Sequence, residues 1–116
     1  MFKRLVVLIL LALATLSASQ PALATTLTIT YLNCYQNGGG NFACDVIASG
    51  GTGSYASYTW VVRLNNSSSY QRVTTEPELI ATCWVDKSFG VTVTVQDSSG
   101  ATASASTGGW CTREAQ

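Results

Sequence analysis

The chain of 116 residues contains no histidine. This absence excludes Ser-His-Asp and Cys-His nucleophilic machinery, and it excludes any metal site with a histidine ligand. Charged residues are also scarce, at 10% of the chain, and they form no basic patch that could bind nucleic acid. No segment after residue 24 has the periodicity of an amphipathic helix. We therefore expect a protein that is not an enzyme, needs no cofactor and binds no nucleic acid.

The first 24 residues have the pattern of a secretory signal peptide. Lys3 and Arg4 give a positive start, residues 5–16 form a short apolar run, and Ala22-Leu23-Ala24 is a small-residue cleavage site. The apolar run is too short for a comfortable membrane span. We expect cleavage after Ala24, a secreted location (extracellular or periplasmic), and no membrane insertion afterwards. Four basic minus six acidic side chains then leaves the mature chain with a net charge of −2.

Four cysteines, all beyond the signal peptide, predict two disulfide bonds, because cysteines of exported proteins normally pair. We favour Cys34–Cys44, which flanks a glycine-rich loop, with Cys83–Cys111, which would tie a strand to the C-terminal end of the domain. The alternative is Cys44–Cys111 with Cys34–Cys83. A zinc site is disfavoured because no C-x-x-C spacing is present, and we expect no metal.

Period-two alternation of apolar and polar residues predicts short β-strands. The pattern places Cys44, Val46 and Ala48 on one face of a strand, and Tyr58, Trp60, Val62 and Leu64 on one face of the next, with Trp60 in the core. Between them, Gly50, Gly51 and Gly53 suggest a turn with positive φ. The expected strands span residues 26–31, 42–49, 58–64, 70–74, 79–84, 91–96 and 101–106.

Other segments carry more local expectations. In the first strand, Leu27, Ile29 and Tyr31 should share one face, and residues 35–41 should form a polar loop. The buried face of the strand at 79–84 is left open by its pattern. Residues 112–116 should form a frayed C-terminal tail after a domain that spans residues 25–111.

Three segments resemble the PKD and PKD-like branch of immunoglobulin-like domains. They are the glycine-rich turn at residues 48–55, the motif Tyr58-Thr59-Trp60, and the Val-Thr-Val strand with its Asp-x-x-Gly hairpin at residues 91–103. The resemblance implies an all-β, immunoglobulin-like antiparallel β-sandwich of about seven short strands. It says almost nothing about function.

Candidate sites are few. Trp84 and Trp110 each follow or precede a cysteine, so strand alternation would point them outward, where they could form a ligand platform for a sugar ring or a protein surface. Alternatively, they shield the disulfide or cover one end of the core. We expect a monomeric, non-catalytic binding or adhesion module whose partner is a protein or glycan surface. The alternative is a purely structural extracellular domain.

Carboxylates and asparagines offer weaker candidates. Glu76 and Glu78 flank a proline in an expected loop and are better explained as a solvated acidic turn than as a catalytic pair. Three aspartates could bind calcium only if their loops converge, and the last of them more simply caps its own turn. These are Asp45, Asp86 and Asp97. Asn65 and Asn66 each begin an N-glycosylation pattern.

Overall fold

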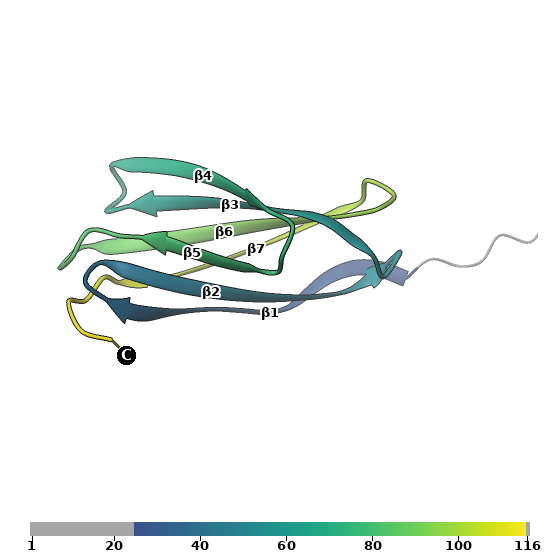
Figure 1. The fold of residues 1–116 in the computed structure, drawn as a ribbon. Coiled ribbons are helices and arrows are strands. Elements are labelled where there is room, and N and C mark those ends of the chain that lie inside the picture. The colour runs from purple at the N-terminus through teal and green to yellow at the C-terminus, as the bar shows by residue number, and fades with distance from the viewer. Residues whose placement is uncertain (1–24, 116) are drawn as a thin grey trace, which may run out of the picture.

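The structure is a computed structural model in which residues 25–115 are described (Figure 1). The expected signal peptide lies outside the described residues. The described chain forms seven strands joined by turns. They are β1 (Thr25–Gly38), β2 (Asn41–Gly51), β3 (Tyr55–Leu64), β4 (Ser68–Thr74), β5 (Glu78–Thr82), β6 (Ser88–Asp97) and β7 (Thr102–Trp110).

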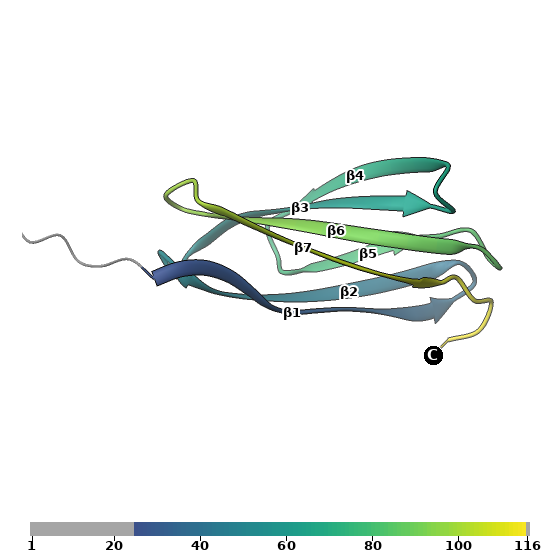
Figure 2. The ribbon, with the colours of Figure 1, turned by 180° about the vertical axis from the view of Figure 1, so that it is seen from behind.

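The seven strands form two antiparallel sheets that face each other (Figures 1 and 2). One sheet has the order β1-β2-β5 and the other the order β4-β3-β6-β7. The chain therefore crosses from one sheet to the other between β2 and β3, between β4 and β5, and between β5 and β6. The predicted all-β sandwich is confirmed, and its topology is compatible with an immunoglobulin-like fold. β4 pairs with β3, whereas the fourth strand of a constant-type immunoglobulin domain joins the sheet of the first two strands.

The core lies between the sheets and is built from alternate residues of the inner strands. Trp60 and Val62 of β3 are fully buried, and the three valines of β6, at 91, 93 and 95, are fully buried beside them. Cys44 and Val46 of β2 face them from the other sheet. The inward faces predicted for β2 and β3 are confirmed, and β6 alternates in the same way, because a half-buried strand must alternate its apolar side chains.

β1 differs from its prediction because a bulge interrupts it. Its pairing with β2 shifts between Ile29 and Tyr31, which places one extra residue in the strand. The bulge turns Tyr31 outward, with 46% of its surface exposed, and turns Leu32 towards the core. The expectation that Tyr31 shares the inner face with Leu27 and Ile29 is therefore wrong.

The expected loop at residues 35–41 is also wrong, since most of it is strand. β1 continues to Gly38 and β2 begins at Asn41, so that only Gly39 and Gly40 connect them. Gly38, Gly39 and Gly40 all have positive φ, which allows this short reversal without strain. Residue 36 therefore belongs to β1 and not to a loop, and its glutamine side chain is buried.

The two ends of the sandwich differ, and each needs a name. The disulfide end contains the Gly39–Gly40 turn, the β3–β4 turn, the start of β6 and the Cys83–Cys111 bond. The glycine-turn end contains the β2–β3 turn, the β6–β7 hairpin and the start of β1 (Figure 1). Positive φ at Gly50, Gly51 and Gly53 agrees with the prediction for that turn.

Candidate binding surface at the disulfide end

The structure contains the two disulfide bonds favoured from the sequence. Cys34 and Cys44 are register partners on β1 and β2, with 4.0 Å between their Cα atoms, so this bond lies within one sheet. Cys83 follows β5 and Cys111 follows β7, with 5.9 Å between their Cα atoms. The second bond therefore joins the two sheets covalently at one end.

Backbone hydrogen bonds surround the Cys83–Cys111 bond. The Cys83 amide donates to the Gly40 carbonyl over 2.8 Å. The Cys111 amide donates to the Lys87 carbonyl, and the Cys111 carbonyl accepts from the Asp86 amide, each over 2.8 Å. These bonds join the β1–β2 turn, the segment between β5 and β6, and the segment after β7 at the disulfide end.

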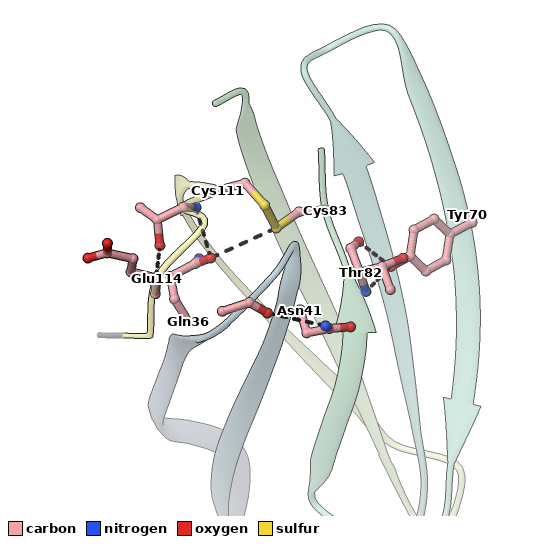
Figure 3. Close-up of a disulfide and its surroundings, with 9 residues drawn as sticks. Gln36, Asn41, Tyr70, Thr82, Cys83, Cys111 and Glu114 are labelled. Atoms are coloured by element: carbon pink, nitrogen blue, oxygen red, sulfur yellow. Dashed lines mark hydrogen bonds between the residues drawn. A yellow bond between two sulfur atoms is a disulfide. The ribbon is translucent and has the colours of Figure 1, made fainter. Parts of the chain in front are cut away.

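The buried Gln36 side chain ties the C-terminal residues to this end (Figure 3). Its Oε1 accepts a hydrogen bond from the Thr112 amide over 3.2 Å, and the Gly39 amide donates to the Arg113 carbonyl over 2.8 Å. The Cys83 sulfur lies 4.0 Å from the same Oε1, but a disulfide sulfur carries no proton, so this is a contact and not a hydrogen bond. Thr112 and Arg113 are thus held in place, in contrast to the frayed tail expected from the sequence.

Tyr70 links the edges of the two sheets at the same end (Figure 3). Its hydroxyl donates to the Thr82 carbonyl over 2.8 Å and lies 3.2 Å from the Thr82 amide, from which it accepts. The hydroxyl takes the place of a neighbouring strand for this residue of β5. An exposed strand edge is a template for unwanted pairing, and Tyr70 occupies part of it.

Trp84 and Trp110 are both substantially exposed, at 45% and 59%, although the adjacent Cys83 and Cys111 are buried. Trp110 ends β7 and pairs with Ser88 of β6, while Trp84 begins a turn in which the Lys87 amide donates to its carbonyl over 3.0 Å. The backbone segments that carry the two rings meet at Cys111. Each ring therefore presents apolar surface to solvent on a rigid support.

The carboxylates do not converge on one site. Glu76 lies in the connection before β5, and Glu78 starts β5, where it is the register partner of Asp45 on β2. Asp86 lies at the disulfide end, whereas Asp97 lies at the opposite, glycine-turn end. Among residues 25–115 there is no group of three or more His, Cys, Asp or Glu side chains that could hold a metal ion.

Asp97 stabilises the glycine-turn end. Its Oδ1 accepts from the Ser99 hydroxyl, the Ser99 amide and the Ala101 amide, and its Oδ2 accepts from the Thr52 amide of the β2–β3 turn. Asp97 caps its own turn, as expected, and also joins it to a second turn. The Ser99 hydroxyl, foremost, and these three amides hold the pKa of Asp97 below its ordinary value of 3.8, although burial of the carboxylate opposes them.

Sequence reasoning did not single out Arg63, which the structure places on the outer face of the four-stranded sheet. Its Nη1 donates to the Thr92 hydroxyl of β6 over 3.0 Å. Its register partner on β6 is Gly90. The pairing of Arg63 with a glycine could have drawn attention to this position, but this pair can be recognised only when the register of β3 against β6 is known.

No protein-family model, curated protein or solved structure matches the chain. In the part of the chain that the structure describes, no helix is long and apolar enough to span a membrane. The class is therefore given by the fold and the covalent bonds alone. The chain is a β-sandwich of two antiparallel sheets, with two disulfide bonds, compatible with the immunoglobulin-like fold.

Proposed function

We propose that the protein is a secreted, non-catalytic binding or adhesion module that contacts a carbohydrate or protein surface through the tryptophans at its disulfide end. The exposure of Trp84 and Trp110 carries this proposal. Large aromatic side chains are usually mostly buried, and two that stay exposed beside one buried disulfide need a reason. Contact with a partner supplies it, since aromatic rings contribute strongly to both protein and sugar binding.

Secretion is supported by the leader pattern of residues 1–24 and by the disulfides, which persist in oxidising compartments. The absence of catalysis is supported by the lack of histidine and by the pairing of all four cysteines, which leaves no thiol nucleophile. We further infer an outlying relationship to PKD-like domains. It is supported by the positive-φ glycines ahead of Tyr58-Thr59-Trp60 and by the burial of Trp60. We expect the module to act as a monomer.

The test is a glycan array and a set of binding titrations with the secreted, oxidised protein. We expect binding to a defined set of glycans or to a surface protein, and we expect Trp110→Ala to weaken it at least about tenfold, as for an interface hot spot. Trp84→Ala should also weaken binding. The matched control is Ile80→Ala, because Ile80 is 77% exposed but lies on the outer face of the other sheet.

Loss of binding in Ile80→Ala but not in the tryptophan variants would place the site elsewhere and contradict the proposal. No binding to any glycan or extracellular protein would favour a purely structural role instead. Wild-type melting temperatures of all three variants would show that each change acts on binding and not on folding.

A further inference from the structure

One row of residues crosses the outer face of the four-stranded sheet near the disulfide end. Ser69 of β4 pairs with Arg63 of β3, Arg63 with Gly90 of β6, and Gly90 with Gly108 of β7. Trp110 lies two residues beyond Gly108 on the same strand, so its side chain projects from the same face. Arg63 on β3 and the exposed indole on β7 thus share one face, with Gly90 on β6 and Gly108 on β7 completing the row.

The two glycines contribute no side chains of their own to this part of the sheet. Gly90 has no positive φ, so its backbone does not require glycine. A Cβ atom at Gly90 would lie only 2.5 Å from Arg63 Nη2, which shows that the guanidinium lies over this residue. A Cβ atom at Gly108 would lie 2.7 Å from the Phe89 carbonyl oxygen. Glycine at position 90 therefore makes room for the Arg63 guanidinium, and glycine at position 108 makes room for the Phe89 carbonyl.

The Arg63 guanidinium is held in position but keeps most of its donors. Within residues 25–115 its one side-chain hydrogen bond goes to Thr92, and the one ion pair joins Arg113 to Asp86. A guanidinium has five N–H donors in a planar fork that matches a carboxylate. An open hollow of about 330 Å³ adjoins it, lined further by Asn66 and residues 67–69, all serines.

Positive and negative side chains are unevenly distributed over the described chain. Three of its four cations, Arg63, Lys87 and Arg113, lie at the disulfide end, against Asp86 and Glu114. Asp97 lies at the glycine-turn end, and the other three carboxylates lie on or next to the three-stranded sheet; these are Asp45, Glu76 and Glu78. The disulfide end therefore carries three cations against two carboxylates, and Arg63 shares its sheet face with Trp110.

We propose that this face binds a carboxylated polysaccharide, an inference that rests on the proposed function and specifies its ligand. One sugar ring stacks on Trp110, and its carboxylate, or that of the adjacent unit, accepts two N–H groups of Arg63. Strand spacing puts the Cα atoms of these two residues about 12 Å apart, which the two long side chains and the sugar span together. The hollow beside Asn66 accepts a neighbouring unit of the polysaccharide.

The experiment compares an oligogalacturonate with its methyl ester, in which each carboxylate is replaced by a neutral ester group. Titration calorimetry with the oxidised protein should show the acid binding at least about tenfold more tightly than the ester, the contrast expected of a charge-assisted bidentate pair. Arg63→Gln should remove the difference, because it should weaken acid binding far more than ester binding. Arg63→Lys should restore only part of it, because lysine keeps the charge but not the planar fork.

Two further variants separate position from charge. Gly90→Ala keeps every charge but displaces the Arg63 guanidinium from its position over residue 90, so it should also reduce the preference for the acid. Trp110→Ala should weaken acid and ester alike. Thr92→Val removes the hydroxyl that orients Arg63 and should reduce the preference without reducing ester binding.

The outcomes distinguish this inference from the proposed function. Equal binding of acid and ester, or array binding confined to neutral glycans, would overturn the carboxylate assignment and leave the binding module standing. Tighter binding of dextran sulfate than of any carboxylated array member would also overturn it. Absence of binding to every glycan on the array and to every extracellular protein tested would overturn both the carboxylate assignment and the proposed binding function.

Discussion

Trp60 is the side chain on which the core depends most. It is fully buried between the sheets, and its Nε1 donates to the Thr74 hydroxyl over 2.9 Å. We predict that Trp60→Ala lowers the free energy of unfolding by about 3–5 kcal/mol, because it leaves a cavity that the surrounding strands cannot fill. Urea unfolding followed by circular dichroism measures the change.

Two variants serve as controls for Trp60. Trp60→Phe loses the hydrogen bond but keeps much of the apolar volume, so it should cost clearly less than Trp60→Ala. Val73→Ala changes a side chain that is 62% exposed on the edge strand β4, and it should leave stability within about 0.5 kcal/mol of wild type. A wild-type unfolding curve for Trp60→Ala would contradict the placement of β3.

Asp97 should make stability depend on pH. Its pKa in the folded protein lies below the ordinary 3.8 because the Ser99 hydroxyl, foremost, and three amides donate to it. A lowered pKa contributes stability that is present above the unfolded value and is lost as the pH falls through the folded value. We predict that Asp97→Asn is most destabilising at neutral pH and that its difference from wild type shrinks below about pH 4. Urea unfolding at several pH values measures this difference.

Ser99→Ala is the matched variant for this effect. It removes the largest single cause of the lowered pKa and leaves the three amide donors, so it should give a smaller loss with the same dependence on pH. A difference between Asp97→Asn and wild type that stays constant from pH 7 to pH 3 would show that the charge of Asp97 is not stabilised in the fold.

At the scale of elements, alternation in the sequence was enough for the strands that pass through the middle of each sheet. Val91, Val93 and Val95 repeat strictly, so the inner face of this part of β6 could be predicted, although β6 begins at Ser88, before the expected strand at 91–96. β1 could not be, because a bulge adds one residue without any mark in composition and reverses the faces beyond it. The loop expected at residues 35–41 was too long because polar residues such as Gln36 normally indicate loops, whereas here Gln36 lies in β1.

The two disulfides brace different elements and should contribute differently. Cys83–Cys111 closes a sequence separation of 28 residues and Cys34–Cys44 one of 10. Loop-closure entropy predicts a loss of about 3.6 kcal/mol for the double alanine variant of the first and about 2.7 kcal/mol for that of the second. Urea unfolding of the two double variants tests the order, and a larger loss for the Cys34–Cys44 pair would contradict it.

At the scale of the whole molecule, the candidate site was predictable only in part. Exposure of Trp84 and Trp110 was one of two alternatives that their positions next to cysteines left open, and the structure shows both side chains exposed. The row of Arg63, Gly90 and Gly108 could not be predicted, because it depends on the register of three strands whose residues are far apart in sequence. Local patterns specify which way a side chain points, and only the sheet pairing specifies its neighbours.

The placement of the bond between Cys83 and Cys111 also determines how the molecule carries mechanical load. Thr25 lies at the glycine-turn end and Arg113 at the disulfide end, so a pull on these two residues acts along the length of the strands (Figure 2). The covalent bond routes tension from Cys83 directly to Cys111 and bypasses residues 84–110. β6, β7 and the exposed Trp110 lie inside this bypassed loop, so they bear no covalent tension even when the rest of the chain is extended.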